Sequence, residues 1–159
     1  MADAATMTIK AVLLPEEIQA TLKDLSFAYT PADANDKWFY GIVNVPHNTG
    51  GVDLITGKFL AASAGVATGT ANADITTSDK VKFLFVKNTS TSDGIVISID
   101  AGTAAFNLGD GIFVGPEQSW FCRLPNTTVA DIHAISSDIG DAGDASANVI
   151  VAALIDDVG

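Results

Sequence analysis

Residues 79–136 read DKVKFLFVKNTSTSDGIVISIDAGTAAFNLGDGIFVGPEQSWFCRLPNTTVADIHAIS, and residues 147–156 read ANVIVAALID. Short runs of β-branched and aromatic residues alternate here with clusters of Gly, Asp, Asn, Ser and Thr. Turn-forming clusters every ~8–12 residues are typical of an antiparallel sandwich or jelly roll. No helical pattern separates the runs, as the crossovers of a parallel sheet would require. The stretch therefore predicts an all-β chain with a single antiparallel β-sandwich or jelly-roll-like domain.

Residues 81–88 are expected to form a central strand, because apolar side chains fill both of its faces. A simple alternation places Val81 with Phe83 and Phe85 on one face. In the next run the same alternation turns Ile95, Ile97 and Ile99 inward. The remaining strands of the domain are expected at residues 38–45, 52–60, 104–108, 112–115, 119–124, 129–136 and 148–155, with a turn at residues 125–128. Of these, the strand at residues 52–60 is expected to be weak and interrupted by Gly57.

The N-terminal residues 1–30 are expected to form an extended arm with the first strands, ahead of a sandwich domain at residues 31–159. Residues 7–14 have strand composition, and Pro15 ends the run. The segment after it suits either one helical turn or an extended chain to Tyr29, and the alternation after Glu17 favours the extended form. Apolar side chains in the arm must join the core or bind a partner. The candidate partner-binding residues are Met7, Ile9, Val12, Leu13 and Leu14.

A second candidate contact segment is the stretch at residues 61–79, which is rich in Gly, Ala and Thr and has no apolar period. Such a composition predicts a long surface loop, and long loops often carry the contacts of a rigid scaffold.

Composition excludes several classes of function. The chain has 159 residues, 48% of them hydrophobic and only 17% charged, with a net charge of −11. Nucleic acids and anionic membranes are poor partners for a chain whose few basic residues are scattered. No signal peptide and no membrane-spanning run is visible, so we expect a soluble protein made in a cytosol.

Metal and cofactor chemistry finds little support in the residues. The chain has two histidines, His47 and His133, and one cysteine, Cys122, without the spacing of a zinc site. We expect Cys122 and His133 to be structural and His47 to be solvated. The repeat Asp138, Asp141, Asp144 leaves a weak calcium site open, although the EF-hand spacing is absent. No metal or cofactor is predicted.

Enzymatic motifs are likewise missing from the sequence. It contains no G-x-S-x-G elbow, no P-loop and no dinucleotide-binding glycine motif. Adjacent carboxylates such as Asp156 and Asp157 would face opposite ways in a strand. The sequence therefore predicts no catalytic residue and no enzyme. Trp38 and Tyr40 share a face and, with Trp120, leave a sugar-binding surface as an alternative, although core positions are favoured.

Several segments resemble a known group of proteins. DANDKWFY, DKVKFLFVKNT and GPEQSWFCRLPNTTVADIHAIS, followed by VIVAALIDD, are similar to small virion structural proteins of tailed bacteriophages, particularly marine, cyanophage-like ones. The similarity runs from about Thr30 onward and rests on general pattern. It implies a head decoration or cement protein bound to the outer face of the major capsid protein lattice. No ligand or catalytic residue is carried over.

This resemblance implies a virion location on the capsid surface, with assembly in the host cytoplasm. A dimer or trimer would suit a lattice with local symmetry. A tail, fibre or neck component and a carbohydrate-binding sandwich module remain the alternatives.

Overall fold

The described part of the chain consists of β-strands and one short 3₁₀ helix. A computed structural model describes all residues except 1–4, 10–24, 48–50, 61–73, 100–110 and 138–144. Among the described residues no helix has the length and apolarity that crossing a membrane would require. The elements are β1 (Ala5–Ile9), β2 (Leu25–Tyr29), β3 (Asp36–Val45), β4 (Val52–Asp53), β5 (Lys80–Asn88), β6 (Gly94–Ser98), β7 (Ile112–Val114), β8 (Ser119–Thr128), the 3₁₀ helix η2 (Val129–Asp131), β9 (His133–Ser137) and β10 (Ala147–Asp156).

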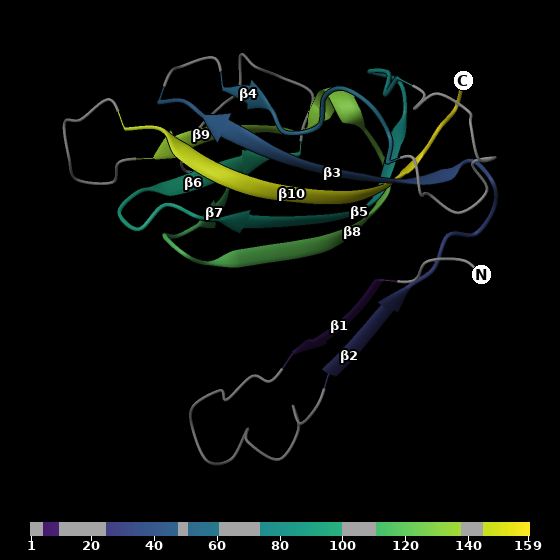
Figure 1. Ribbon diagram of the computed structural model, residues 1–159, viewed down its shortest axis with the longest axis horizontal. Helices are drawn as coiled ribbons and strands as arrows, with labels where there is room; N and C mark the ends of the chain where they lie inside the picture. The colour runs from purple at the N-terminus through teal and green to yellow at the C-terminus, as the bar shows by residue number, and fades with distance from the viewer. Residues whose placement is uncertain (1–4, 10–24, 48–50, 61–73, 100–110, 138–144) are drawn as a thin grey trace.

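Two four-stranded sheets make up the body, with strand orders β3-β10-β5-β8 and β4-β9-β6-β7. All neighbours in both sheets are antiparallel. The sheets lie face to face in a sandwich-like arrangement (Figure 1). The all-β, antiparallel prediction is therefore confirmed.

The strand pairs follow a simple rule. β3 pairs with β10, β4 with β9, β5 with β8 and β6 with β7, as if β3 to β6 formed one arm of a long hairpin and β7 to β10 the other. Two further pairs, β10 with β5 and β9 with β6, join distant parts of this hairpin side by side. Partners far apart in sequence thus become neighbours in both sheets.

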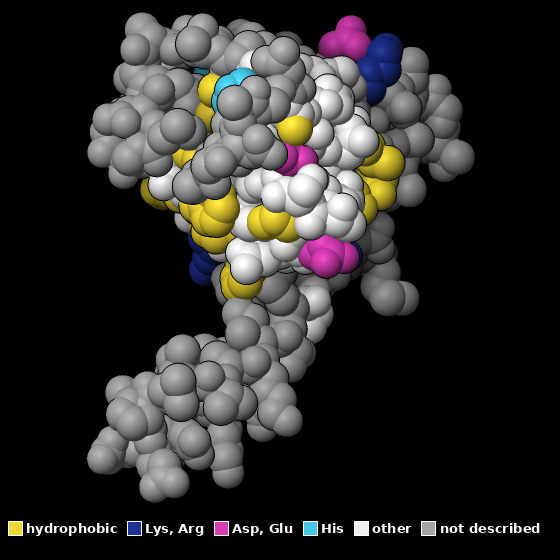
Figure 2. All heavy atoms as spheres, turned by 90° about the vertical axis from the view of Figure 1, so that its left-hand side faces the viewer, with side chains coloured by type: hydrophobic (Ala, Val, Ile, Leu, Met, Phe, Trp, Pro, Cys, Tyr) yellow, Lys and Arg dark blue, Asp and Glu magenta, His cyan; other side chains and the backbone are white. Residues whose placement is uncertain are grey.

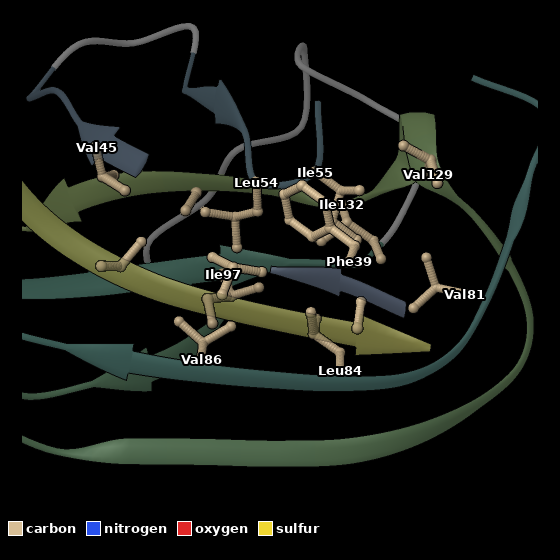
Figure 3. Packing of buried hydrophobic residues seen from close by; sticks show 14 of the residues in the cluster. Phe39, Val45, Leu54, Ile55, Val81, Leu84, Val86, Ile97, Val129 and Ile132 are labelled. Atoms are coloured by element: carbon tan, nitrogen blue, oxygen red, sulfur yellow. The ribbon is translucent and has the colours of Figure 1, made fainter. Parts of the chain in front are cut away.

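One hydrophobic cluster fills the space between the sheets (Figure 3). Leu84 and Val151 enter it from one sheet, and Ile97 and Ala134 from the other; all four are fully buried. Alternate residues of a strand point to opposite faces, so these strands place every second side chain in the core. The strands predicted at residues 38–45, 81–88 and 148–155 are confirmed within one or two residues at each end.

The strand predicted at residues 52–60 is wrong beyond its first two positions. β4 ends at Asp53, and the chain then turns through Gly57, which has a φ of 100° that L-residues rarely adopt. Leu54, Ile55 and Phe59 are buried in the core cluster at no more than 2% exposure. These apolar side chains are inserted between the sheets from an irregular segment. The sequence pattern does not distinguish such a segment from a strand.

The turn predicted at residues 125–128 is also wrong, because β8 continues through Thr128. Pro125 is compatible with this strand, since β8 is an edge strand and its pairing with β5 is irregular near the proline. The strand predicted at residues 129–136 begins instead as the 3₁₀ helix η2, and β9 starts at His133.

Two side chains depart from the predicted alternation. Val81 is fully buried in the core cluster with Leu84, whereas Phe83 lies outside that cluster. The pairing register shifts between Val81 and Phe83, so a β-bulge turns Val81 to the core side. Ile99 is 37% exposed because β6 ends at Ser98 and the alternation stops there.

The arm contains a two-stranded ribbon, β1 paired with β2, that projects away from the body (Figure 1). Its register sets Met7 opposite Phe27 and Ile9 opposite Leu25. The extended form predicted for the chain up to Tyr29 agrees with β2 over its last five residues. The predicted contact residues Val12, Leu13 and Leu14 lie outside the described residues.

Candidate functional site

The solvent side of the sheet β3-β10-β5-β8 is unusually apolar. Residues that alternate with its core positions point away from the other sheet, and we call this side the outer face. Antiparallel sheets with one solvated side normally place polar residues there. The apolar members of the outer face are Trp38, Tyr40 and Ile42 from β3, Ile150, Ala152 and Leu154 from β10, Phe83 and Phe85 from β5, and Phe121 from β8.

Exposure on the outer face is greatest along β3. Ile42 is 68% exposed and Tyr40 is 51% exposed. Their register neighbours on β10, Ile150 and Ala152, are half-buried. Contiguous exposed apolar side chains of this kind often mark a surface that contacts another protein.

Two aromatic rings close one end of the outer face. The rings of Trp38 and Phe83 meet edge to face, with centroids 6.3 Å apart and planes at 77°. Leu154 lies on β10 between the strands that carry them, and it is fully buried. This edge-to-face geometry is the preferred one for aromatic pairs. The rings therefore pack beside Leu154, while Tyr40 and Ile42 further along the face stay accessible.

A charged cluster joins three strands at the same end. Lys82 Nζ lies 2.6 Å from Asp36 Oδ1 and 3.1 Å from Asp156 Oδ2. Asp36 is fully buried, and its other oxygen accepts a hydrogen bond of 2.6 Å from the amide of Ala32. Burial opposes the charge on Lys82, but its hydrogen bonds and charge interactions with both aspartates raise its pKa well above the ordinary value. The cluster is an internal ion pair that locks β3, β10 and β5 together.

Three carboxylates of this cluster lie close together in space. Asp33, Asp36 and Asp156 place oxygens within 4.8 Å of one another. The Lys82 ammonium already bonds two of the three, so it supplies the positive charge that a cation would bring. The neighbouring residue Asp157 pairs with a different lysine, Lys37. The adjacent carboxylates Asp156 and Asp157 therefore pair with two different lysines.

A buried amide organises the opposite end of the sheet. Asn88 is fully buried, and its Nδ2 donates hydrogen bonds to the carbonyl oxygens of Asp93 (2.7 Å), Gly115 (3.1 Å) and Val114 (3.3 Å). Its Oδ1 accepts a bond of 3.0 Å from the amide of Ser90. This side chain joins the end of β5 to the loop before β6 and to the end of β7. Figure 2 views this end of the molecule and shows hydrophobic side chains among only scattered charged ones.

A serine, a histidine and an aspartate stand side by side in the second sheet. The register sets Asp53 on β4 opposite His133 on β9, and His133 opposite Ser98 on β6. His133 Nδ1 lies 2.8 Å from Asp53 Oδ1, and the histidine is 7% exposed. The geometry therefore agrees with the prediction of a structural His133.

His47 and Trp120, two other candidates from the sequence, differ in exposure. His47 is exposed, as expected, and its Nδ1 lies 3.0 Å from the carbonyl oxygen of Ser136. Trp120 is half-buried and packs against the core cluster, so it is not on the outer face with Tyr40. Trp38, Tyr40 and Trp120 therefore do not form a row of exposed aromatic rings.

Cys122 is half-buried against the core cluster, and burial raises the pKa of its thiol to about 11. Only the thiolate is nucleophilic, and a shift from 9.0 to about 11 lowers its fraction near neutral pH about 100-fold. We expect iodoacetamide to label the native chain at pH 8 about 100-fold more slowly than the chain in denaturant. Mass spectrometry of timed samples measures both rates, and equal rates would contradict the burial of this thiol.

The structure describes only some of the predicted contact residues of the arm and none of the acidic repeat. Met7 and Ile9 lie in β1. Val12, Leu13 and Leu14, and the repeat Asp138, Asp141 and Asp144, lie outside the described residues. Sequence reasoning missed the outer face and the Lys82 cluster. The sequences of β3 and β10 do contain a signal for the outer face, because apolar residues occupy both alternating sets of positions in these strands.

Comparison of the chain with protein-family models, with curated proteins and with solved structures finds no match.

Proposed function

We propose that the chain is a bacteriophage virion structural protein, a decoration or cement protein that binds the outer face of the major capsid protein lattice and stabilises the head. It acts there by burying apolar surface against protein, without bond-making chemistry. It reaches this position on the capsid surface after synthesis in the host cytoplasm.

The observation that carries the proposal is the apolar character of the outer face of the sheet β3-β10-β5-β8 in this chain. Tyr40 and Ile42 leave apolar surface accessible beside Ile150 and Phe85. A protein that works only by contact needs area and rigidity, and stable interfaces bury ~1,200–2,000 Å² in total. The ion cluster at one end of the sheet and the Asn88 hydrogen bonds at the other supply rigidity.

We further propose that the body is a jelly roll. The eight strands pair as one long hairpin rolled into two sheets, which supports this topology. Double-sheet jelly rolls of eight strands recur in viral capsid proteins and in lectins. The topology is thus compatible with the virion role and with a sugar-binding role.

The projecting ribbon supports a clamp-like role for the arm. A two-stranded hairpin alone is marginally stable in water at best. Apolar residues occupy alternate positions of β1, namely Ala5, Met7 and Ile9, and they pair with Tyr29, Phe27 and Leu25. A ribbon of this kind gains stability when a neighbouring subunit covers it.

A binding assay on phage heads tests the role. We expect the full chain to bind purified heads that lack it, at a copy number near that of the major capsid protein. A chain without residues 1–14 should lose most of this binding while its far-UV circular dichroism keeps the β-sheet signal. Quantitative gel densitometry of washed heads measures both. Binding only to tails, or undiminished binding by the shortened chain, would contradict the head role or the arm's part in it, respectively.

A sugar-binding module is the second candidate, favoured by the exposed Tyr40 ring beside Trp38 on the outer face. Quenching of tryptophan fluorescence by a panel of oligosaccharides separates the two roles. Saturable quenching that Tyr40→Ala abolishes would favour sugar recognition, whereas no quenching favours protein contact.

A further inference from the structure

The edges of the two sheets differ in how well they resist pairing with another strand. β4 and β7, the edges of one sheet, have only two and three residues. β8 carries Arg123 and Pro125, which both hinder pairing. β3 has ten residues, and from Trp38 to Val45 it contains no charge and no proline. β3 therefore lacks the features that protect exposed edges.

Hydrogen bonds at both ends of β3 show which backbone groups face its outer edge. The carbonyl of Trp38 accepts a bond of 2.8 Å from Leu60 N–H, and the carbonyl of Pro46 accepts one of 3.1 Å from Ser136 N–H. Backbone groups of alternate residues point to the same side of a strand. The N–H and C=O groups of Tyr40, Ile42 and Asn44 therefore point to the outer edge. Within the described part of the chain, no backbone group bonds to this edge between those two contacts.

We propose that a second copy of this chain pairs with β3 through this edge, antiparallel, with the two-fold axis at Ile42. The stretch between the contacts at Trp38 and Pro46 is centred on Ile42, so this register uses the backbone N–H and C=O groups of Tyr40, Ile42 and Asn44. Ile42 then exchanges both backbone hydrogen bonds with Ile42 of the second copy. Tyr40 does the same with Asn44 of the second copy. The two sheets β3-β10-β5-β8 become one continuous sheet.

The side chains of β3 fit a second copy better than an unrelated strand. A two-fold axis makes the interface self-complementary, as in most homodimers. It brings together two Ile42 side chains that are each 68% exposed in the single chain. The segment is uncharged in a chain of net charge −11, so the two copies meet where their mutual repulsion is weakest.

The inference is independent of the proposed place in the virion, because the dimer forms from the purified chain alone. The dimer would also present two copies of the outer face of the sheet β3-β10-β5-β8 to a capsid. Heads that bind no protein would leave the dimer intact, and a monomer in solution would leave the head assay unchanged, so the two proposals fail separately.

Light scattering after size exclusion, over a series of chain concentrations, tests the dimer. We expect a dimeric mass for the full chain and, for Ile42→Lys, self-association weaker by about tenfold or more, because two cations would face each other across the axis. Phe113→Lys is the matched control: Phe113 is 51% exposed on the other sheet, and its substitution should leave the mass unchanged. A monomeric mass at every concentration, or equal effects of the two variants, would overturn the inference.

Cross-linking tests the register and does not depend on the folding of the lysine variant. Residues that face each other in a hydrogen-bonded antiparallel pair have Cα atoms ~5.5 Å apart, within the range that a disulfide bridges. Ile42→Cys should therefore give a covalent dimer on a non-reducing gel after mild oxidation. Tyr40→Cys should not, since the axis at Ile42 offsets the two copies of position 40 by four residues along the strand, or roughly 14 Å. Linkage of both variants at the same rate, or of neither, would overturn the register.

Discussion

Replacing Lys82 with methionine should lower the free energy of unfolding by about 3–5 kcal/mol, the usual cost of removing one partner from a buried ion pair. Asp36 is fully buried, and Lys82 Nζ lies 2.6 Å from its carboxylate and 3.1 Å from that of Asp156. Methionine keeps most of the side-chain length but leaves a buried negative charge uncompensated. Urea unfolding followed by tryptophan fluorescence measures the change.

The pH dependence separates the charge effect from lost packing. The raised pKa of Lys82 means that its contribution is complete below its unfolded value of 10.5 and is lost only as pH rises through the higher folded value. The contribution of Lys82 to the unfolding free energy of the native chain should therefore not decrease between pH 5 and about 9. The difference in unfolding free energy between the native chain and Lys82→Met should therefore stay constant over this range and shrink only as pH rises through the folded pKa of Lys82.

Lys87→Met is the control for this prediction. Lys87 lies on the same strand but is exposed, so its removal should change the unfolding free energy by less than about 0.5 kcal/mol. Equal losses for the two variants would contradict a stabilising role for the cluster around Lys82.

Asn88→Ala should be the next most damaging change, with a loss of about 3 kcal/mol or more, because each unsatisfied buried polar group costs ~1–3 kcal/mol. The substitution removes the hydrogen bonds that Asn88 makes to the carbonyls of Asp93, Val114 and Gly115 and to the amide of Ser90. Thermal unfolding by circular dichroism, compared at equal chain concentration, measures the effect.

Asn148→Ala provides a matched control near the same end of the sheet. Its side-chain amide oxygen accepts a 3.0 Å bond from Asn44 Nδ2, and both residues are exposed. Water replaces that bond, so the loss should stay below about 1 kcal/mol. An Asn88→Ala variant as stable as Asn148→Ala would show that the buried amide does not join the two sheets.

The clearest failure of sequence reasoning concerns β5. Simple alternation puts Val81 with Phe83, but the register with β10 passes from Ile155 opposite Val81 to Leu154 opposite Phe83, leaving Lys82 without an opposite residue. A bulge re-aims the side chain at the inserted position. Here it brings Lys82 to Asp36 and Asp156, which no local pattern predicts.

The outer face shows a different limit. The run WFYGIVNV predicts a strand and sets Trp38 and Tyr40 on the face opposite Phe39, and the structure agrees. Because both faces of β3 and β10 are apolar, alternation cannot tell which one is core. Only the position of the second sheet makes Phe39 buried at 5% exposure and Tyr40 accessible at 51%.

By itself, the sequence determined the all-β class and the three long strands at residues 38–45, 81–88 and 148–155. These follow from side-chain alternation and turn chemistry, which act over a few residues. The tertiary structure alone decided which apolar face meets water, where β5 bulges, and which distant carboxylates Lys82 pairs with. Those features depend on the register between strands whose paired residues lie up to 120 positions apart, as Asp36 and Asp156 do, and register is set by the packing of whole sheets.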